Sequence, residues 1–263
     1  MDLKLQHRRA LICGGSSGLG RAVATALVAE GVHVILLSRH AASLSEAAEA
    51  LNAMGPGRAG FVTADLADHE GLLKAVDRAE AQLGGPVEIL LNNTGGPPPS
   101  GVSGLEPAVW RDHFESMVLS IFRLTDRVLP AMRAAGWGRI LNVASITVVE
   151  PSAALGVSNT LRASVAAWAK TLANEVGPDG VTVNTLLPGR IDTPRIDRLD
   201  RAAAERTGMT PLQARADSVK SIPVGRIGST EEFGATAAFL ASPLAAYVTG
   251  SLIRLDGGAV KSI

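Results

Sequence analysis

The sequence predicts a single α/β domain over residues 1–263, with helices on both faces of a parallel, doubly wound, seven-stranded sheet. Three observations indicate this fold class. Short apolar runs alternate with Ala-rich segments along the chain, a glycine-rich turn joins the first run to the first helical segment, and no linker or repeat interrupts the pattern. Strict alternation of strand and helix with short connections is typical of parallel sheets covered on both sides.

The predicted strands are short apolar runs, several of them nearly continuous, as expected of parallel strands that are buried on both faces. In chain order they are residues 10–13, 32–37, 60–63, 87–91, 139–143, 181–187 and 251–255. The longest uncharged stretch, 233–253, contains Gly, Ser and Pro residues that divide it into a short helix, a turn and a strand. We therefore do not expect it to form a membrane span, although its length approaches the roughly 20 residues that a span needs.

The helical segments lie between these strands and are rich in Ala. They are predicted at residues 18–30, 42–54, 69–83, 107–135, 155–176 and 230–241. The segment 155–176 carries an apolar stripe from Leu161 to Leu172 with helical spacing, and Gly177-Pro178 ends it. Residues 191–228 are the longest interruption of the alternation. In an open α/β sheet, such an insertion near the carboxyl ends of the strands usually covers the ligand crevice.

Composition and charge exclude several classes of function. The chain has 25 Lys and Arg residues and 25 Asp and Glu residues, so a basic surface for nucleic acid or an anionic membrane is not expected. One Cys excludes a disulfide framework and a multi-thiolate metal site, and a hydrophobic content of 46% excludes a disordered chain. Residues 1–9 are polar and lack the apolar core of a signal peptide, so we expect a cytoplasmic protein without a metal.

A glycine-rich turn follows the first strand and opens the first helix. Gly14, Gly18 and Gly20 have the spacing G-x-x-x-G-x-G, which permits a tight turn and close approach of the backbone to a pyrophosphate. The helix N-terminus then offers free N–H groups and the positive end of its dipole. Such a turn alone is often only a turn, but the strand–turn–helix context predicts a Rossmann-like dinucleotide site.

The end of the second strand indicates which dinucleotide binds. An NAD site usually has an acidic residue there, about 20 residues past the glycines, for the ribose 2′-hydroxyl. This chain instead has Ser38, Arg39 and His40, and no carboxylate occurs before Glu46. A guanidinium binds a 2′-phosphate in bidentate fashion, so NADP is favoured over NAD. The alternative is that Arg39 is a solvated loop residue.

Motifs in order along nearly the whole chain resemble those of the short-chain dehydrogenase/reductase family, in particular its 3-oxoacyl-[acyl-carrier-protein] reductase-like members. They occupy residues 13–20, 65–66, 92–95, 188–193 and 247–258. Cys13 replaces a Thr of the family pattern and Thr94 replaces an Ala. The predicted cofactor-binding residues are Gly14, Ser16, Ser17, Gly18, Leu19, Gly20, Ser38, Arg39, Asp65, Leu66, Asn92, Thr94, Gly95, Arg162, Pro188, Gly189, Ile191 and Thr193.

The resemblance also implies where the catalytic residues lie, and most of these positions are substituted. The family uses a Tyr as general acid/base, a Lys four residues later that lowers its pKa, and a Ser about 13 residues before it that polarises the substrate carbonyl. The Ser position is occupied by Ser145, but the Tyr position holds Ser158 and the Lys position holds Arg162. The position of a helical Asn that supports a water holds Met117, and the only tyrosine is Tyr247, in the C-terminal motif.

These substitutions leave two hypotheses open. A serine hydroxyl is a poor proton source beside a tyrosine of pKa about 10. Arg162 stays protonated and cannot act as a base, but it can bond the ribose hydroxyls or stabilise an alkoxide. The first hypothesis is an NADP-dependent oxidoreductase that acts on a small carbonyl or alcohol substrate through Ser145, Ser158, Arg162 and water. The second is a non-catalytic NADP-binding sensor or partner subunit.

Several other residues have two readings. His113 lies one helical turn before Met117 and is a conceivable proton donor, although an ordinary packing role is preferred. The arginines 190, 195, 198 and 201 either meet an anionic substrate or form a solvated face, and the second reading is preferred. Cys13 is expected to be a small buried residue rather than a reactive thiol. The resemblance also implies a homo-oligomer, a tetramer or a dimer.

Overall fold

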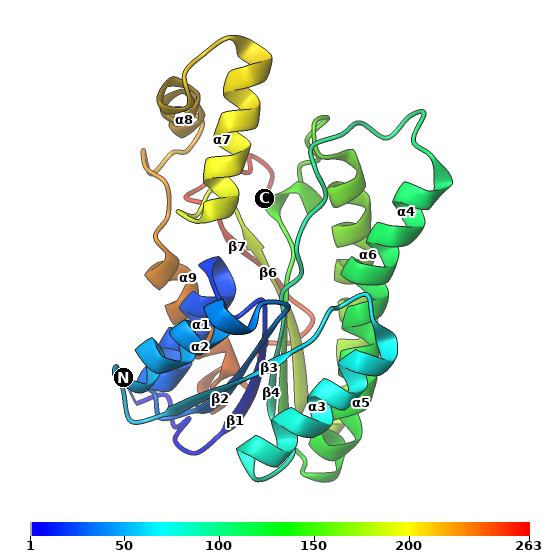
Figure 1. The fold of residues 1–263 in the computed structure, drawn as a ribbon, viewed down its shortest axis with the longest axis vertical. Helices are drawn as coiled ribbons and strands as arrows, with labels where there is room; N and C mark the ends of the chain where they lie inside the picture. Colours follow the sequence, from blue (N-terminus) through cyan, green and yellow to red (C-terminus); the bar gives the residue numbers. More distant parts are fainter. Residues whose placement is uncertain (1) are drawn as a thin grey trace.

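The computed structural model describes residues 2–263, and it confirms the predicted α/β fold with one parallel sheet in the order β3-β2-β1-β4-β5-β6-β7 (Figure 1). The strands are β1 Arg9–Cys13, β2 His33–Ser38, β3 Arg58–Thr63, β4 Ile89–Asn92, β5 Gly138–Val143, β6 Val181–Pro188 and β7 Leu252–Leu255. Every residue of β4, β5 and β6 is buried, which is why these strands are nearly continuous apolar runs in the sequence.

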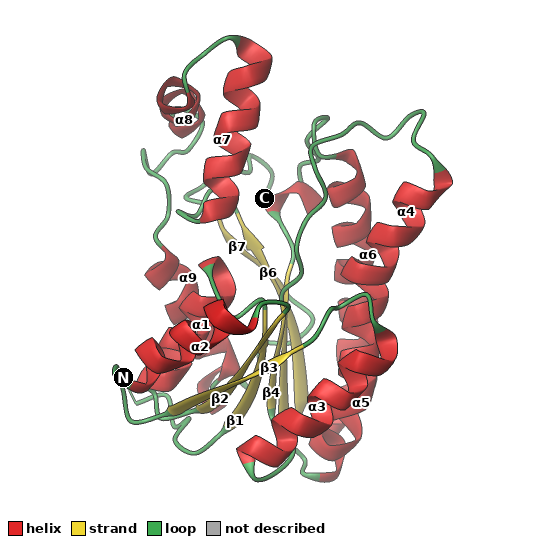
Figure 2. Ribbon diagram, in the orientation of Figure 1, coloured by secondary structure: helices red, strands yellow, loops and turns green. Residues whose placement is uncertain are grey.

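Helices cover both faces of the sheet (Figure 2). They are α1 Gly18–Ala29, α2 Ala41–Asn52, α3 His69–Leu83, α4 Pro107–Phe114, α5 Ser120–Ala134, α6 Gly156–Val176, α7 Pro194–Thr207, α8 Pro211–Val219 and α9 Thr230–Ala241. The buried side chains of α1, α2 and α9 pack in one apolar core, and those of α3, α5 and α6 pack in another on the opposite face. The sheet therefore lies between two hydrophobic layers, as in a doubly wound fold.

The structure differs from the predicted elements in two places. The predicted helix 107–135 is interrupted by a π-helical turn, Glu115–Leu119, which separates α4 from α5. The insertion at 191–228 contains two helices that the apolar pattern did not show, because both are rich in charged residues and α7 buries only Ile196, Asp200 and Ala204. Their starts do carry local signals, since each has Pro at the first turn and Thr210 forms a capping box.

The uncharged stretch 233–253 folds as predicted, with the end of α9, a short 3₁₀ turn at Pro243–Ala245 and the first residues of β7. Among residues 2–263, no helix combines the length and the apolar character that crossing a membrane requires.

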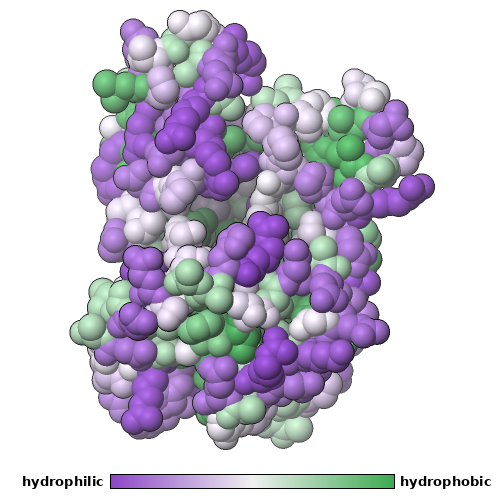
Figure 3. Space-filling model, viewed as in Figure 1, coloured by the Kyte–Doolittle hydropathy of each residue, from purple (hydrophilic) through white to green (hydrophobic). Residues whose placement is uncertain are grey.

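The order of the strands reverses direction between β1 and β4, and this switch point is where open α/β sheets bind ligands. In Figure 1, α7 rises on one side above the carboxyl ends of the strands, and the loop after β4 and the start of α6 rise on the other. Figure 3 shows a hollow between these two sides, with hydrophilic side chains over α7. The insertion therefore flanks the crevice, as expected.

Candidate functional site

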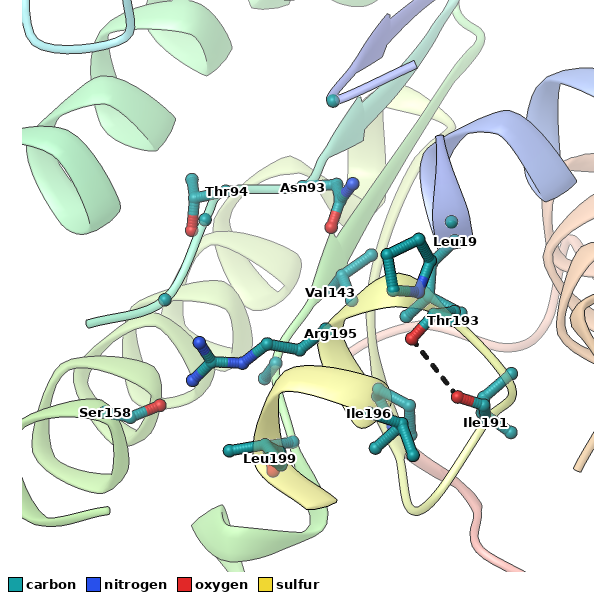
Figure 4. A pocket seen from close by; sticks show the side chains of 18 of the residues that line it. Leu19, Asn93, Thr94, Val143, Ser158, Ile191, Thr193, Arg195, Ile196 and Leu199 are labelled. Carbon is teal, nitrogen blue, oxygen red and sulfur yellow. Dashed lines mark hydrogen bonds between the residues drawn. The ribbon is translucent and has the colours of Figure 1, made fainter. Parts of the chain in front are cut away.

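A cavity of about 310 Å³ lies at the carboxyl ends of the central strands and is lined by residues from the β1–α1 turn, the β4 loop, β5, α6 and α7 (Figure 4). It brings together 13 of the predicted site residues: Gly14, Ser17, Gly18, Leu19, Thr94, Gly95, Ser145, Ser158, Arg162, Pro188, Gly189, Ile191 and Thr193. Residues as far apart in the sequence as Gly14 and Thr193 thus line the same cavity, which supports the prediction that they belong to one site.

The glycine turn has the backbone geometry that the motif predicts. Gly14 and Gly18 have φ angles of 62° and 55°, a region that favours glycine. A Cβ at Gly20 would overlap the carbonyl oxygen of Gly14, so α1 can begin this close to the turn only without a side chain there. Ser17 precedes the helix but makes no side-chain cap, so the first N–H groups of α1 stay available to an anion.

The two asparagines after β4 have different roles. The Asn92 side chain is 1% exposed and donates to Asn142 Oδ1 at 2.9 Å and to Thr125 Oγ1 at 3.2 Å, below the cavity. The prediction that Asn92 lines the cofactor site is not supported by this placement. Asn93 lines the cavity instead, and its Nδ2 donates to the carbonyl oxygen of Cys13 at 3.2 Å. The alternation of side chains along a strand was the signal for this distinction.

Four predicted cofactor residues lie outside this cavity, at the ends of β2 and β3. Arg39 is exposed and makes no ion pair among residues 2–263, while the neighbouring Ser38 Oγ is buried without a partner. A guanidinium and an orphaned hydroxyl side by side are suited to a phosphate. Asp65 is exposed and accepts from the Ala67 N–H at 3.0 Å, and Leu66 packs against the core. Ser16 and Gly20 are also absent from the cavity wall.

Ser145 lies directly after β5 and is held by a local turn. Its backbone is extended, and its Oγ accepts from the Thr147 N–H at 3.2 Å at the start of a 3₁₀ turn, Ile146–Val148. Because the oxygen accepts this bond, the hydroxyl hydrogen is left to donate into the cavity. The position suits a group that polarises a carbonyl.

Ser158 and Arg162 lie one turn apart on α6, and they contact each other. Arg162 Nε donates to Ser158 Oγ at 3.3 Å, and Arg162 Nη1 donates to the Val143 carbonyl oxygen at 2.9 Å. Arg162 Nη2 reaches the Gly95 carbonyl oxygen at 3.4 Å. Three acceptors from three segments thus fix this guanidinium at the floor of the cavity. The Ser158 oxygen accepts from this cation, and its own hydrogen remains available to donate; the residue is 6% exposed and lines the cavity.

Arg162 remains a cation at neutral pH. Burial, and secondarily the charge of Arg195, lower the pKa of Arg162 to about 10. Burial, and secondarily the charge of Arg198, also lower the pKa of Arg195. A fixed positive charge next to Ser158 stabilises negative charge that develops on a nearby oxygen.

The structure separates the arginines of the insertion: Arg198 and Arg201 are exposed, as the preferred interpretation of a solvated face predicts, whereas Arg190 and Arg195 are partly buried. Arg195 and Arg198 line the cavity. Arg195 extends toward Ser158 in Figure 4, and its Nη2 donates to the Pro97 carbonyl oxygen at 3.1 Å. Arg190 pairs with the buried Asp200, Arg198 is exposed at the edge of the cavity, and Arg201 is exposed outside the cavity wall. Sequence spacing alone did not show which arginines face inward.

The remaining residues fall where packing predicts. Met117 is buried in an apolar cluster with Ile121 and Leu161, and His113 is outside the cavity wall. Tyr247 is fully exposed and does not line the cavity. Cys13 is buried, as predicted, and burial raises its pKa to about 12. Among residues 2–263, no tyrosine or lysine therefore lines the cavity, and the polar side chains of its wall are Ser, Thr, Asn and Arg.

Known proteins resemble this chain over its full length. A family model described as enoyl-(acyl carrier protein) reductase matches residues 14–260. The 3-oxoacyl-[acyl-carrier-protein] reductase FabG of Pseudomonas aeruginosa is 33% identical over 99% of this chain and 100% of its own length. Nodulation protein G of Azospirillum brasilense is 34% identical over 97% of this chain and 98% of its own.

Solved structures agree with the sequence relatives. L-sorbose reductase from Gluconobacter frateurii, complexed with NADPH and L-sorbose, superposes on 100% of both chains with a TM-score of 0.93 and 32% identity. An actinorhodin polyketide ketoreductase with NADPH covers 97% of this chain and 98% of its own, with a TM-score of 0.91 and 28% identity. With the glycine turn, the sheet order and these matches together, the chain belongs to the short-chain dehydrogenase/reductase family.

Proposed function

We propose that this protein is an NADPH-dependent carbonyl reductase in which Ser145, Ser158 and Arg162 take the roles that its relatives' sequence pattern assigns to Ser, Tyr and Lys. The observation that carries the proposal is that these three side chains share one cavity with the glycine turn. The printed descriptions of its relatives, which include 3-oxoacyl reductases and NADPH-bound ketoreductases, support the reaction class.

The residues on the nucleotide side fit NADPH. The turn 14–18 and the free N–H groups of α1 suit a pyrophosphate, and Ser38 and Arg39 suit the 2′-phosphate. When bound, NADPH supplies the hydride that the substrate carbon accepts. Thr94, Gly95 and the segment 188–193 would hold the nicotinamide end, because they line the cavity beside Ser158 and Arg162.

On the substrate side, the chain's residues act on the carbonyl oxygen. Ser145 donates its hydroxyl hydrogen to that oxygen and so polarises the carbonyl. As the carbonyl carbon is reduced, Ser158 gives its hydroxyl proton to the carbonyl oxygen and then takes a proton from water. The charge of Arg162 stabilises the negative charge first on the carbonyl oxygen and then on the Ser158 oxygen. The net reaction takes one hydride from NADPH and one proton from water, and yields an alcohol, NADP⁺ and a hydroxide ion.

This arrangement predicts slow turnover. A serine is a weaker acid than a tyrosine, and positioned acid/base groups contribute about 10²–10⁴-fold to a rate. Hydride transfer needs mainly orientation, so the reaction retains a measurable rate without the tyrosine.

A second candidate is a non-catalytic NADPH-binding sensor or partner subunit. The observation that favours it is the cavity wall without tyrosine or lysine, since Tyr247 is exposed elsewhere and Lys170 is an exposed residue of α6. Both candidates share the nucleotide site, so binding alone does not separate them.

The test combines cofactor titration with a substrate screen. NADPH and NADH are titrated by calorimetry, and NADPH oxidation is then followed with 3-oxoacyl thioesters, quinones and aldehydes. We expect NADPH to bind more tightly than NADH and at least one carbonyl class to be reduced. Tight NADPH binding without turnover on any class favours the sensor, and binding of neither cofactor contradicts both candidates.

A variant ties any activity to the site. Arg162→Met removes the charge beside Ser158, and we expect it to lower kcat by about 10²-fold, as the loss of one oxyanion donor does. Lys170→Met on the same helix is the matched control, because Lys170 is exposed and outside the cavity. Equal losses in both variants would mean that the effect is not local to the site.

A further inference from the structure

Three arginines from two helices converge on the substrate side of the cavity. Arg162 comes from α6, and Arg195 and Arg198 come from the first turns of α7. Arg162 and Arg195 lie close to each other beside Gly96: a Cβ added at Gly96 would lie 3.2 Å from Arg195 Nη2 and 3.6 Å from Arg162 Nη2. Two guanidinium groups thus flank one point of the wall, next to Ser158.

No carboxylate balances them within the cavity. Among residues 2–263, the cavity wall has three arginines and no Asp or Glu. The aspartates of α7 and of the segment before it are taken by other partners: Arg215 pairs with Asp192 and Asp197, and Arg190 pairs with Asp200. The remaining acid of α7, Glu205, is exposed and outside the cavity wall. Neither Arg195 nor Arg198 forms an ion pair in the described part of the chain, although both lie on a helix whose two aspartates are paired.

Arg195 also has N–H donors without a partner in the protein. A guanidinium has five N–H donors, and Arg195 uses one of its donors on the Pro97 carbonyl oxygen. Burial, and secondarily the charge of a neighbouring arginine, lower the pKa of both Arg162 and Arg195, so holding these two cations together in a half-enclosed site is unfavourable. A bound anion would relieve this repulsion and use the free donors.

An anion bound at Arg195 would lie apart from the pyrophosphate of the cofactor. The glycine turn meets α7 at Thr193, where a Cβ on Gly18 would lie 3.6 Å from Thr193 Cγ2. In Figure 4, the Arg195 side chain leads away from Leu19 and Thr193 and ends near Ser158. It therefore faces the place where the reacting carbonyl lies in the proposed function.

We propose that the substrate is a small carbonyl compound that carries an anionic group, a carboxylate or a phosphate. Its carbonyl oxygen lies at Ser145 and Ser158. Its anionic group binds Arg195, and Arg198 lies at the rim of the same site. This inference rests on the proposed function and names the substrate class for the same site. Arg195 is here a specificity-determining residue, and Arg162 retains its role at the reacting oxygen.

The test uses matched charged and neutral probes. NADPH-dependent reduction is measured with acetoacetate against acetoacetamide, and with dihydroxyacetone phosphate against dihydroxyacetone. For at least one pair, we expect kcat/KM for the anion to exceed that of its neutral partner by about ten- to a hundredfold, the range for a hydrogen bond to a charged group. A preference in the first pair identifies a carboxylate site and one in the second a phosphate site, whereas equal values in both pairs overturn the proposal.

Variants place the preference at Arg195. Arg195→Met should reduce the ratio to near one, mainly by raising KM for the anionic probe. Arg206→Met, an exposed arginine on the last turn of the same helix, is the control and should keep the ratio. A preference that survives Arg195→Met would overturn the assignment.

A binding measurement separates this proposal from the proposed function. The four probes are titrated by calorimetry into the protein with and without NADPH. Anion binding that depends on Arg195 but leads to no turnover would support the anion site and contradict the reductase. Turnover of neutral and charged probes alike would support the reductase and contradict the anion site, and absence of anion binding together with absence of turnover would contradict both.

Discussion

The two ends of the cavity are built in different ways. The nucleotide end consists mainly of backbone: Gly14 and Gly18 supply the turn, and uncapped N–H groups of α1 supply the positive end of a helix. The substrate end consists of side chains, with Ser158 and Arg162 on α6 facing Arg195 on α7. In the proposed function, the cofactor end follows the family's sequence pattern, while Ser158 and Arg162 at the substrate end depart from it.

This difference indicates that binding and chemistry are separable in the fold. Backbone geometry at the turn is fixed by three glycines, none of which touches α6. The position of Arg162 is fixed by carbonyl oxygens of Val143 and Gly95, which do not depend on the residue type at position 158. Changes at one end should therefore leave the other end's function measurable, and the following predictions use this.

The largest expected effect is a gain at the substrate end. Replacing Ser158 by Tyr and Arg162 by Lys together restores a general acid with a tunable pKa, and we expect the rate of carbonyl reduction to rise by about 10²–10⁴-fold. NADPH affinity should change little. The measurement is steady-state NADPH oxidation with the single variants as controls, and an unchanged rate in a folded double variant would mean that more than the acid/base pair separates this site from its relatives.

The next effect concerns the choice of nucleotide. Arg39→Asp removes the partner for a 2′-phosphate and adds an acceptor for a ribose hydroxyl. We expect the ratio of NADPH to NADH affinity to fall by about 10-fold to 100-fold, since a charge-assisted hydrogen bond is lost. Titration of both cofactors measures the ratio, with Arg58→Asp, on the neighbouring β3 strand, as the control. An unchanged ratio would contradict the 2′-phosphate assignment.

A smaller effect tests the turn as a backbone device. In Gly20→Ala, the added Cβ overlaps the Gly14 carbonyl oxygen, so the turn must shift, and overpacking of this kind costs about 1–3 kcal/mol of stability. We expect weaker NADPH binding and a lower Tm. Gly177→Ala is the control because a Cβ there meets nothing within 4 Å. Wild-type affinity in Gly20→Ala would contradict the close approach of helix and turn.

The smallest effect is the pH dependence of turnover. The pKa of the Arg162 guanidinium is lowered to about 10, mainly by burial, so its positive charge is present at neutral pH and is lost as pH rises through about 10. We expect kcat to be flat between pH 7 and pH 9 and to have fallen by about half at pH 10. Arg162→Met should lack this decline. A decline that begins near pH 7 would contradict the assignment of this dependence to Arg162.

Most of the fold could be predicted from the sequence because the strands and the glycine turn, which define it, have strong local sequence signals. All seven strands and the glycine turn lie within a few residues of their predicted positions, since apolar runs and glycine spacing are local properties. The helices α7 and α8 were missed because charged surface helices have little apolar periodicity, and the π-turn at Glu115–Leu119 leaves no pattern of its own.

Within the site, residue types were predictable and orientations were not. The cavity contains 13 of the predicted residues, yet Asn92 points below it and Asn93 into it. Arg195 and Arg198 were placed on a solvated face because sequence spacing does not show which partners the neighbouring acids choose. Asp192, Asp197 and Asp200 pair with Arg190 and Arg215, and only the tertiary structure shows that the inward arginines are left without them.

The most direct test of the central claim follows the hydride itself. Deuterated NADPH is incubated with the protein and a carbonyl substrate, and the alcohol is analysed by mass spectrometry for wild type, Arg162→Met and the control Lys170→Met. We predict that deuterium enters the alcohol in proportion to NADPH consumed, at a rate about 10²-fold lower in Arg162→Met and unchanged in Lys170→Met. NADPH that binds tightly while no label reaches any carbonyl would contradict the account and leave a protein that binds the cofactor without using it.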